Sequence, residues 1–196
     1  MQITELSRQV QDFLLNLPDV KACRLYGSLS TGTHDEYSDV DMEVDVSGTD
    51  NGLFATMLPS ILAQQFDVIF ADFAPSLAPE KYVLSVALDP DNPFGVVDLA
   101  PVAVPHCASV SREALARRNN RYDHTLKLFS ANLKHALRRT DCTSDVSKMY
   151  HRVFGADTAE VGIFEMLRQT WDWLWNTAEE RHRKYVRNFR PYLDRL

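Results

Sequence analysis

Two acidic side chains placed one residue apart, Asp39 and Asp41, are the feature of this 196-residue sequence that most suggests chemistry. From residue 39 to residue 46 acidic and apolar residues alternate strictly, and this pattern predicts a β-strand with one apolar face. Both carboxylates therefore leave the strand on the same side, about 7 Å apart. Two carboxylates so placed can share divalent cations. Mg²⁺ is favoured, because it takes one or two protein carboxylates together with waters and substrate phosphates.

A glycine-serine pair, Gly27-Ser28, precedes these acids by ten residues and follows an apolar run at residues 20–26 that predicts another strand. A glycine lets the backbone come close to a phosphate group, and a serine hydroxyl can hydrogen-bond phosphate oxygens. Each feature alone is common, since most Gly-Ser turns and acidic strand faces are only structural. Their order and spacing together predict a site for a metal-bound nucleotide.

This stretch resembles the signature of the polymerase-beta-like nucleotidyltransferase superfamily, in which a hydrophobic residue, Gly and Ser are followed by a spacer and then acid, hydrophobic residue, acid. Residues 22–46 carry the resemblance, with Asp39-Val40-Asp41 as the acidic part. They are most similar to the antibiotic nucleotidyltransferases, the lincosamide type first and the aminoglycoside type next. Many members carry Arg or Lys immediately before the second glycine, where this chain has Thr31, so a phosphate contact from that position is in question.

A third acid, Asp98, lies inside the apolar segment at residues 96–100, where an unpaired charge would be costly. A strand end at the surface would also explain it. If it instead faces Asp39 and Asp41 across a sheet, three carboxylates converge. The resemblance implies a third carboxylate at this place in the topology, where it binds metal or deprotonates the acceptor hydroxyl. The expected catalytic and metal-binding residues are therefore Asp39, Asp41 and Asp98.

The resemblance further implies a metal-dependent nucleotidyltransferase that moves a nucleoside monophosphate, expected to be AMP, from a Mg-bound nucleoside triphosphate to a hydroxyl group and releases pyrophosphate. The implied cofactor is Mg²⁺, as two ions, and ATP is the implied substrate. A small acceptor is expected, with lincosamide or aminoglycoside antibiotics, and hence antibiotic resistance, as the guess for its identity. The expected nucleotide contacts are Gly27, Ser28, Ser38, Lys127 and Lys134.

Two other functional classes stay open. The chain could be an antitoxin-like or non-catalytic protein of the same fold that binds or modifies a partner protein, or it could be a transferase that modifies nucleic-acid ends. The net charge of −6 and charges that alternate in sign disfavour a nucleic-acid groove, so no nucleic-acid partner is expected. A homodimer is one option for the oligomeric state, which the sequence does not decide.

The elements around these residues predict an α+β fold. A helix over residues 3–17 precedes the first strand, and a hairpin joins residues 82–88 to 94–100 around the turn at residues 89–93. Residues 53–66 predict a helix shortened or kinked by Pro59, and residues 68–70 a buried strand. Residues 75–81 predict a loop. The catalytic domain is expected to be a small mixed β-sheet with flanking helices at residues 1–105, ending in a linker at residues 101–106.

Residues 106–196 are expected to form a C-terminal bundle of about four helices. Helical spacing covers residues 122–137 and 146–153, and a third helix is expected to begin at Asp157, three residues before Glu160, and to turn Phe164 inward. Pro191 is expected to close the last helical stretch. Residues 1–111 hold 4 basic and 16 acidic side chains, and residues 112–196 hold 17 and 11. A basic second half could therefore close over phosphates bound by the acidic half.

Composition places the chain among ordinary globular proteins, with 45% hydrophobic and 24% charged residues. No apolar run approaches the roughly 20 residues of a membrane span, and the N-terminal residues do not read as a signal peptide. A cytoplasmic protein without a membrane partner is expected. The three cysteines lie far apart, which predicts reduced thiols and neither a disulfide framework nor a zinc site.

Overall fold

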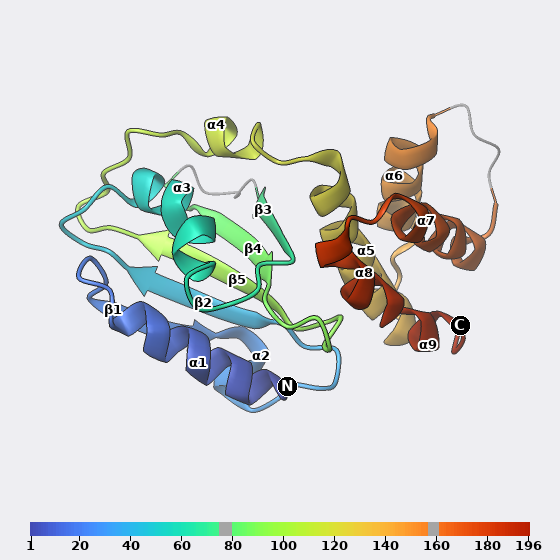
Figure 1. Ribbon diagram of the computed structural model, residues 1–196, viewed down its shortest axis with the longest axis horizontal. Coiled ribbons are helices and arrows are strands. Elements are labelled where there is room, and N and C mark those ends of the chain that lie inside the picture. Colours follow the sequence, from blue (N-terminus) through green and yellow to red (C-terminus); the bar gives the residue numbers. More distant parts are fainter. Residues whose placement is uncertain (75–79, 157–160) are drawn as a thin grey trace.

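The computed structural model describes residues 1–74, 80–156 and 161–196, and in them the chain forms a five-stranded mixed sheet with helices on it (Figure 1). The strand order is β1-β2-β5-β4-β3, in which only the β2–β5 pair is parallel. The predicted α+β class is confirmed. The strands are β1 Ala22–Tyr26, β2 Val40–Asp45, β3 Phe70–Ala74, β4 Val83–Ala87 and β5 Val96–Val102.

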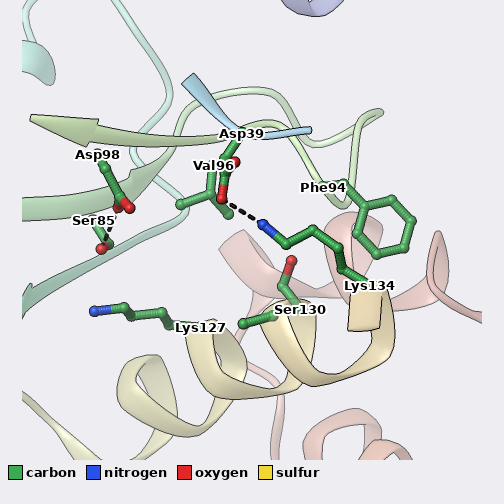
Figure 2. A pocket seen from close by; sticks show the side chains of 9 residues that line it. Asp39, Ser85, Phe94, Val96, Asp98, Lys127, Ser130 and Lys134 are labelled. Atoms are coloured by element: carbon green, nitrogen blue, oxygen red, sulfur yellow. Dashed lines mark hydrogen bonds and ion pairs between the residues drawn. The ribbon is translucent and has the colours of Figure 1, made fainter. Parts of the chain in front are cut away.

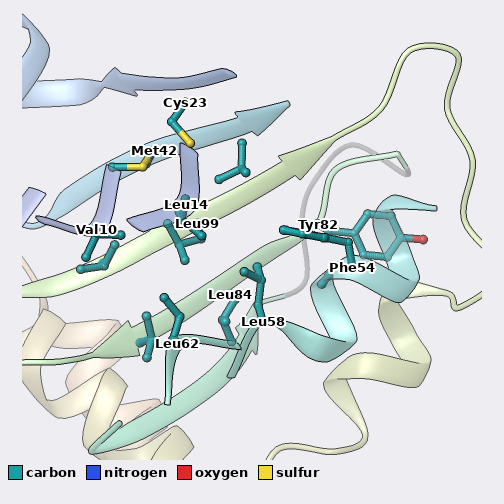
Figure 3. Close-up of a cluster of buried hydrophobic side chains, with 14 of the residues drawn as sticks. Val10, Leu14, Cys23, Met42, Phe54, Leu58, Leu62, Tyr82, Leu84 and Leu99 are labelled. Carbon is teal, nitrogen blue, oxygen red and sulfur yellow. The ribbon is translucent and has the colours of Figure 1, made fainter. Parts of the chain in front are cut away.

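One face of the sheet is covered by two helices, α1 (Ile3–Leu15) and α3 (Asn51–Leu62). The apolar half of the β2 alternation points into this layer, where all its side chains are fully buried. Figure 3 shows the cluster, in which Leu14 of α1 and Leu58 of α3 lie against Met42 and Leu99 of the sheet. Because alternate residues of a strand face opposite ways, the acids of β2 must point to the other face.

The opposite face is only partly covered by the helices that follow β5. A second apolar cluster joins Phe70, Ala87, Phe94 and Val96 to the helical part of the chain. Its helices are α4 Arg112–Ala116, α5 Arg121–Leu137, α6 Thr143–Phe154, α7 Ile163–Thr177, α8 Glu180–Arg187 and α9 Arg190–Leu193. Four of these described helices have eight residues or more, as predicted. The helices therefore share a core with the sheet, and the division at residue 105 stays a prediction.

Most predicted elements are present with small shifts at their ends. The hairpin of β4 and β5 is confirmed by antiparallel pairing of Leu84 with Leu99. The short turn after β1 is a helix, α2 (Gly27–Thr31), which ends at Gly32 with φ +69°. Pro59 lies inside α3, which is twelve residues long. Figure 1 shows α2 and α1 on the side of the sheet where the chain begins.

Several predicted bounds are wrong. The strand expected at residues 68–70 begins at Phe70, and the expected linker starts with two further residues of β5. Pro101 is tolerated there because β4 pairs with β5 only as far as Leu99, so that side of the strand needs no N–H donor. Pro191 lies in the first turn of α9, where its missing N–H costs nothing, and does not end the helix.

The third bundle helix also differs from its prediction. It begins at Ile163 after Gly162, and the capping pair expected at Asp157 and Glu160 lies outside the described residues, as does most of the loop expected at residues 75–81. Phe164 is 44% exposed, because it lies in the first turn, and Met166 and Thr170 take the buried positions. No helix of the described chain is long and apolar enough to cross a membrane.

Candidate active site

Three carboxylates meet on the open face of the sheet because of how β2 and β5 pair. The two strands run parallel, and their register sets Asp41 directly beside Asp98. Asp39 lies one residue before β2 and, by the alternation, on the same face as Asp41. From the next strand, Ser85 is the register partner of Asp98, and its hydroxyl donates a hydrogen bond of 2.5 Å to Asp98 Oδ1. The convergence expected of the three acids is therefore present.

Two lysines of α5 face these acids across a cavity of about 60 Å³ (Figure 2). Lys134 Nζ lies 2.5 Å from Asp39 Oδ2, in a pair with Lys134 only 13% exposed. Lys127 Nζ lies 3.1 Å from Asp72 Oδ2 instead, and Asp72 is fully buried. Both lysines were expected at a nucleotide, and both line this inner cavity. Its residues are Asp39, Ser85, Phe94, Val96, Asp98, Lys127, Ser130, Ala131 and Lys134.

A larger outer cavity of about 370 Å³ continues along the same strands. It contains Glu43 and Ala100, which are register partners two residues beyond Asp41 and Asp98, or about 7 Å farther along the sheet. Its other lining residues are Arg24, Leu25, Tyr26 and Lys81. The row formed by Asp41 and Asp98 therefore lies between a small inner cavity near α5 and a larger outer cavity.

Burial and mutual repulsion shift the acids toward protonation. The pKa of Asp41 is raised to about 6, first by burial and then by the negative charges of Asp39 and Asp98, although Lys134 and Lys81 oppose the shift. Burial also raises the pKa of Asp98, against the hydrogen bond from Ser85. The pKa of Tyr26 rises to about 12 through burial and then the same acids. A site with this charge would hold a cation more readily than an anion.

Gly27 is placed directly against the acids. Its φ is +67°, and a Cβ atom at this position would overlap Asp41 Oδ2. The neighbouring Ser28 hydroxyl has no hydrogen-bond partner within the described chain, so it is available to a ligand. The two expected nucleotide contacts of the turn thus lie beside Asp41. Thr31 bonds only within its own turn, to Gly27 O, Ser28 O and Thr33 Oγ1.

Ser38 is placed differently from the other expected contacts. It is 3% exposed, and its hydroxyl donates to Asp35 Oδ1 at 2.9 Å while accepting from the Asp35 N–H at 2.9 Å. Arg138 also reaches Ser38 Oγ and holds the Asp35 carboxylate with two hydrogen bonds. Ser38 therefore stabilises the loop that leads to Asp39. Its contact with a nucleotide stays a prediction.

The acids fit divalent cations by their chemistry. Within residues 1–74, 80–156 and 161–196, no group of three or more His, Cys, Asp or Glu side chains is arranged to hold a metal ion by itself. Mg²⁺ needs only one or two carboxylates when phosphates and waters complete its ligands. The raised pKa of Asp41 marks a repulsion that a cation would relieve, and Asp39 already binds the ammonium group of Lys134. Asp39 and Asp41 are the residues that would hold the ion.

Sequence reasoning missed three residues of this site. Ser85 bonds Asp98, Lys81 lies 5.7 Å from the centre of the Tyr26 ring, and Asp72 pairs with Lys127. The alternation of β4 could have indicated Ser85, a polar residue in an apolar strand. Lys81 and Asp72 carry no such signal, because only long-range packing brings them to the site.

No family model matches this chain, and no curated protein does. Two solved structures resemble it in fold. A structure of the GLD-2/RNP-8 complex has 15% sequence identity and a TM-score of 0.40, covering 90% of this chain and 79% of that one. A structure of the non-canonical poly(A) polymerase complex GLD-2–GLD-3 has 16% identity and a TM-score of 0.38, covering 91% of this chain and 55% of that one. Because both TM-scores are below 0.5, function rests on the site residues themselves.

Proposed function

We propose that this protein is a nucleotidyltransferase that moves AMP from Mg-bound ATP to a hydroxyl group of a small acceptor, with pyrophosphate as the leaving product. The observation that carries the proposal is the register of β2 and β5, which sets Asp41 beside Asp98 on one open face with Asp39 in line. Gly27, pressed against Asp41, adds a turn that a phosphate group can approach closely. Lys127 and Lys134 supply positive charge on the facing helix.

In this proposal Asp98 is the general base. Its carboxylate takes the proton of the acceptor hydroxyl, and the acceptor oxygen forms a bond to the α-phosphorus of ATP. The bond between that phosphorus and the oxygen bridging to the β-phosphate breaks, and its electron pair leaves with pyrophosphate. Burial raises the pKa of Asp98, which makes it a better base than an exposed carboxylate, and the Ser85 hydroxyl holds one of its oxygens in place.

Asp39 and Asp41 hold the cation side of the site. Divalent ions bound there would neutralise the triphosphate and stabilise charge on the attacking and leaving oxygens. Lys134, which pairs with Asp39 in the ligand-free chain, is close enough to transfer its contact to a phosphate oxygen when a nucleotide is bound. Lys127 lines the same inner cavity, so both ammonium groups lie where the leaving pyrophosphate would gain charge.

The outer cavity is the proposed acceptor site. Its volume of about 370 Å³ is in the range of small-molecule sites, and Tyr26 supplies an apolar ring beside charged Lys81 and Glu43. The inner cavity of about 60 Å³ is too small for a drug-sized acceptor. Because the motif resembles that of the antibiotic nucleotidyltransferases, lincosamide and aminoglycoside antibiotics are the first acceptors to test.

The test is pyrophosphate release from ATP and Mg²⁺ with a panel of hydroxyl-bearing acceptors. The unchanged chain should release pyrophosphate with at least one of them, and Asp39→Asn should abolish turnover while circular dichroism and thermal unfolding stay near normal. Asp19→Asn is the matched control, because Asp19 is exposed and lies in a turn far from the acids in the fold. Full activity in Asp39→Asn would disprove the assignment of the metal site.

A second candidate is a non-catalytic, antitoxin-like protein of this fold that acts by binding a partner protein. One observation favours it: Lys134 takes the place beside Asp39 that a cation would need, and the described chain holds no ready-made metal cluster. ATP binding would not separate the two candidates. ATP binding without pyrophosphate release, across all acceptors and with Mg²⁺ or Mn²⁺, would favour this second one.

A further inference from the structure

A separate cavity of about 430 Å³ opens where α5 begins, beside the end of α6. None of the acids of the candidate active site lines it, and its volume is typical of a small-molecule site. The lining contains three basic side chains and no acid. The residues are Ala116, Asn119, Asn120, Arg121, His124 and Arg152.

Two guanidinium groups in this lining lack a carboxylate partner within the described chain. Arg121 Nη2 donates to the carbonyl oxygens of Arg152 and Val153, at 3.1 and 2.6 Å, and its guanidinium lies 5.5 Å from the centre of the Trp173 ring. Arg152 makes one side-chain contact, to His124. Arg121 is therefore fixed in position by neutral groups. Both guanidinium groups keep N–H donors for an anion.

His124 holds Arg152 at the cavity through a buried acid. His124 Nδ1 lies 3.0 Å from Oδ1 of fully buried Asp72, and His124 Nε2 lies 2.7 Å from Arg152 Nη1. A guanidinium group can only donate, so Nε2 accepts and Nδ1 donates to Asp72. The chain from Asp72 through His124 orients Arg152 before any ligand arrives. Such preorganisation lowers the entropy lost on binding.

We propose that this cavity binds the phosphate group of a small phosphate ester, of the size of a nucleoside monophosphate, through Arg152 and Arg121. Charge-assisted and bidentate contacts from guanidinium groups are the strongest that proteins make to phosphate. The first turn of the 17-residue helix α5 lies at the cavity, and the positive end of its dipole adds to the attraction. A small ester fits better than a polynucleotide, because the chain as a whole carries a net charge of −6.

The test is calorimetric titration of the full chain with inorganic phosphate and, separately, with AMP. Arg152→Gln should weaken AMP binding at this cavity by about tenfold or more, the effect of losing a hydrogen bond between charged groups. Arg168→Gln is the matched control, because Arg168 is an exposed arginine of α7 that lines none of the cavities described above. It should bind as the unchanged chain does. AMP binding with inorganic phosphate excluded would place the recognition on the ester rather than the free ion.

A second variant separates this cavity from the candidate active site. Lys134→Gln removes a lysine of the inner cavity, and binding at the α5 cavity should survive it. The imidazole NMR signals of His124 should shift when AMP is added to the unchanged chain or to Lys134→Gln, and should stay fixed in Arg152→Gln. Loss of all AMP binding in Lys134→Gln with none lost in Arg152→Gln would overturn the proposal. Binding of a single-stranded oligonucleotide without AMP binding would also overturn it.

Discussion

Gly27 and Asp41 lie so close together that no side chain fits at position 27. The backbone of Gly27 has a left-handed φ of +67°, and Asp41 Oδ2 occupies the place where a Cβ would be. The glycine that follows β1 thus serves one acid of β2 directly. This contact explains physically why a Gly-Ser turn and a pair of acids ten residues later belong to one site.

Replacing this glycine gives the first prediction. Gly27→Ala should displace the Asp41 carboxylate, so Mg-ATP binding measured by calorimetry should fall at least tenfold. Gly32→Ala is the matched control, since Gly32 has a similar φ of +69° but open space around it. The control should lose only the roughly 1–2 kcal/mol of unfolding free energy that a left-handed residue costs. Equal effects of the two changes on Mg-ATP binding would contradict the close contact.

Lys134 gives the second prediction, because it neutralises Asp39 in the ligand-free chain. In Lys134→Gln the three acids repel one another without that cation, so Mg²⁺ alone should bind more tightly than in the unchanged chain. ATP with Mg²⁺ should bind less tightly, because the phosphate loses a charged donor. Both affinities can be measured by calorimetry. Arg139→Gln, an exposed change just beyond α5, should alter neither.

Ser85 gives the third prediction, through its hydrogen bond to Asp98. That bond lowers the pKa of Asp98 against the larger effect of burial, so Ser85→Ala should raise this pKa further. If Asp98 is the base, the acid limb of the pH profile of kcat/KM should move to higher pH, while the plateau at high pH changes little. An unmoved acid limb would show that another group takes the proton. Serine at position 130, in the same cavity, bonds Pro93 O instead, so Ser130→Ala should leave the limb in place.

Asp35 and Arg138 give the fourth prediction, on stability. Two hydrogen bonds from Arg138 hold the pKa of Asp35 at about 2, below its model-peptide value of 3.8. A lowered pKa in the folded chain adds stability at pH values above 3.8, and this stability is lost as the pH falls toward 2. Asp35→Asn should therefore lower the urea midpoint at pH 7 and change it far less at pH 2.

The size of this effect is limited by solvent. Asp35 is 45% exposed, so the loss at pH 7 should be small and should shrink in 1 M salt. Asp12→Asn, which breaks a pair on α1, is the control for a fully exposed ion pair. An equal difference between the unchanged chain and Asp35→Asn at pH 7 and pH 2 would mean that the carboxylate contributes nothing through its charge.

Local pattern alone determined much of this protein. The alternation of residues 39–46 predicted β2 and the shared face of Asp39 and Asp41, and helical spacing predicted α1, α5 and α6. These predictions succeed because strand and helix periods are set by neighbouring residues. Bounds failed where a fold-level partner decided them, as for Phe164, which stands in a first turn with little to pack against.

The tertiary structure alone decided how the site is assembled. The pairing of Asp41 with Asp98 joins residues far apart in sequence, and a slip of one residue in register would turn Asp98 to the apolar face. Likewise, only the packing of α5 on the sheet brings Lys134 to Asp39 and Lys127 to Asp72. Ser38, which the motif placed at a nucleotide, is taken up by Asp35 and Arg138. Side-chain types are local information, whereas the partner that each side chain meets depends on the whole fold.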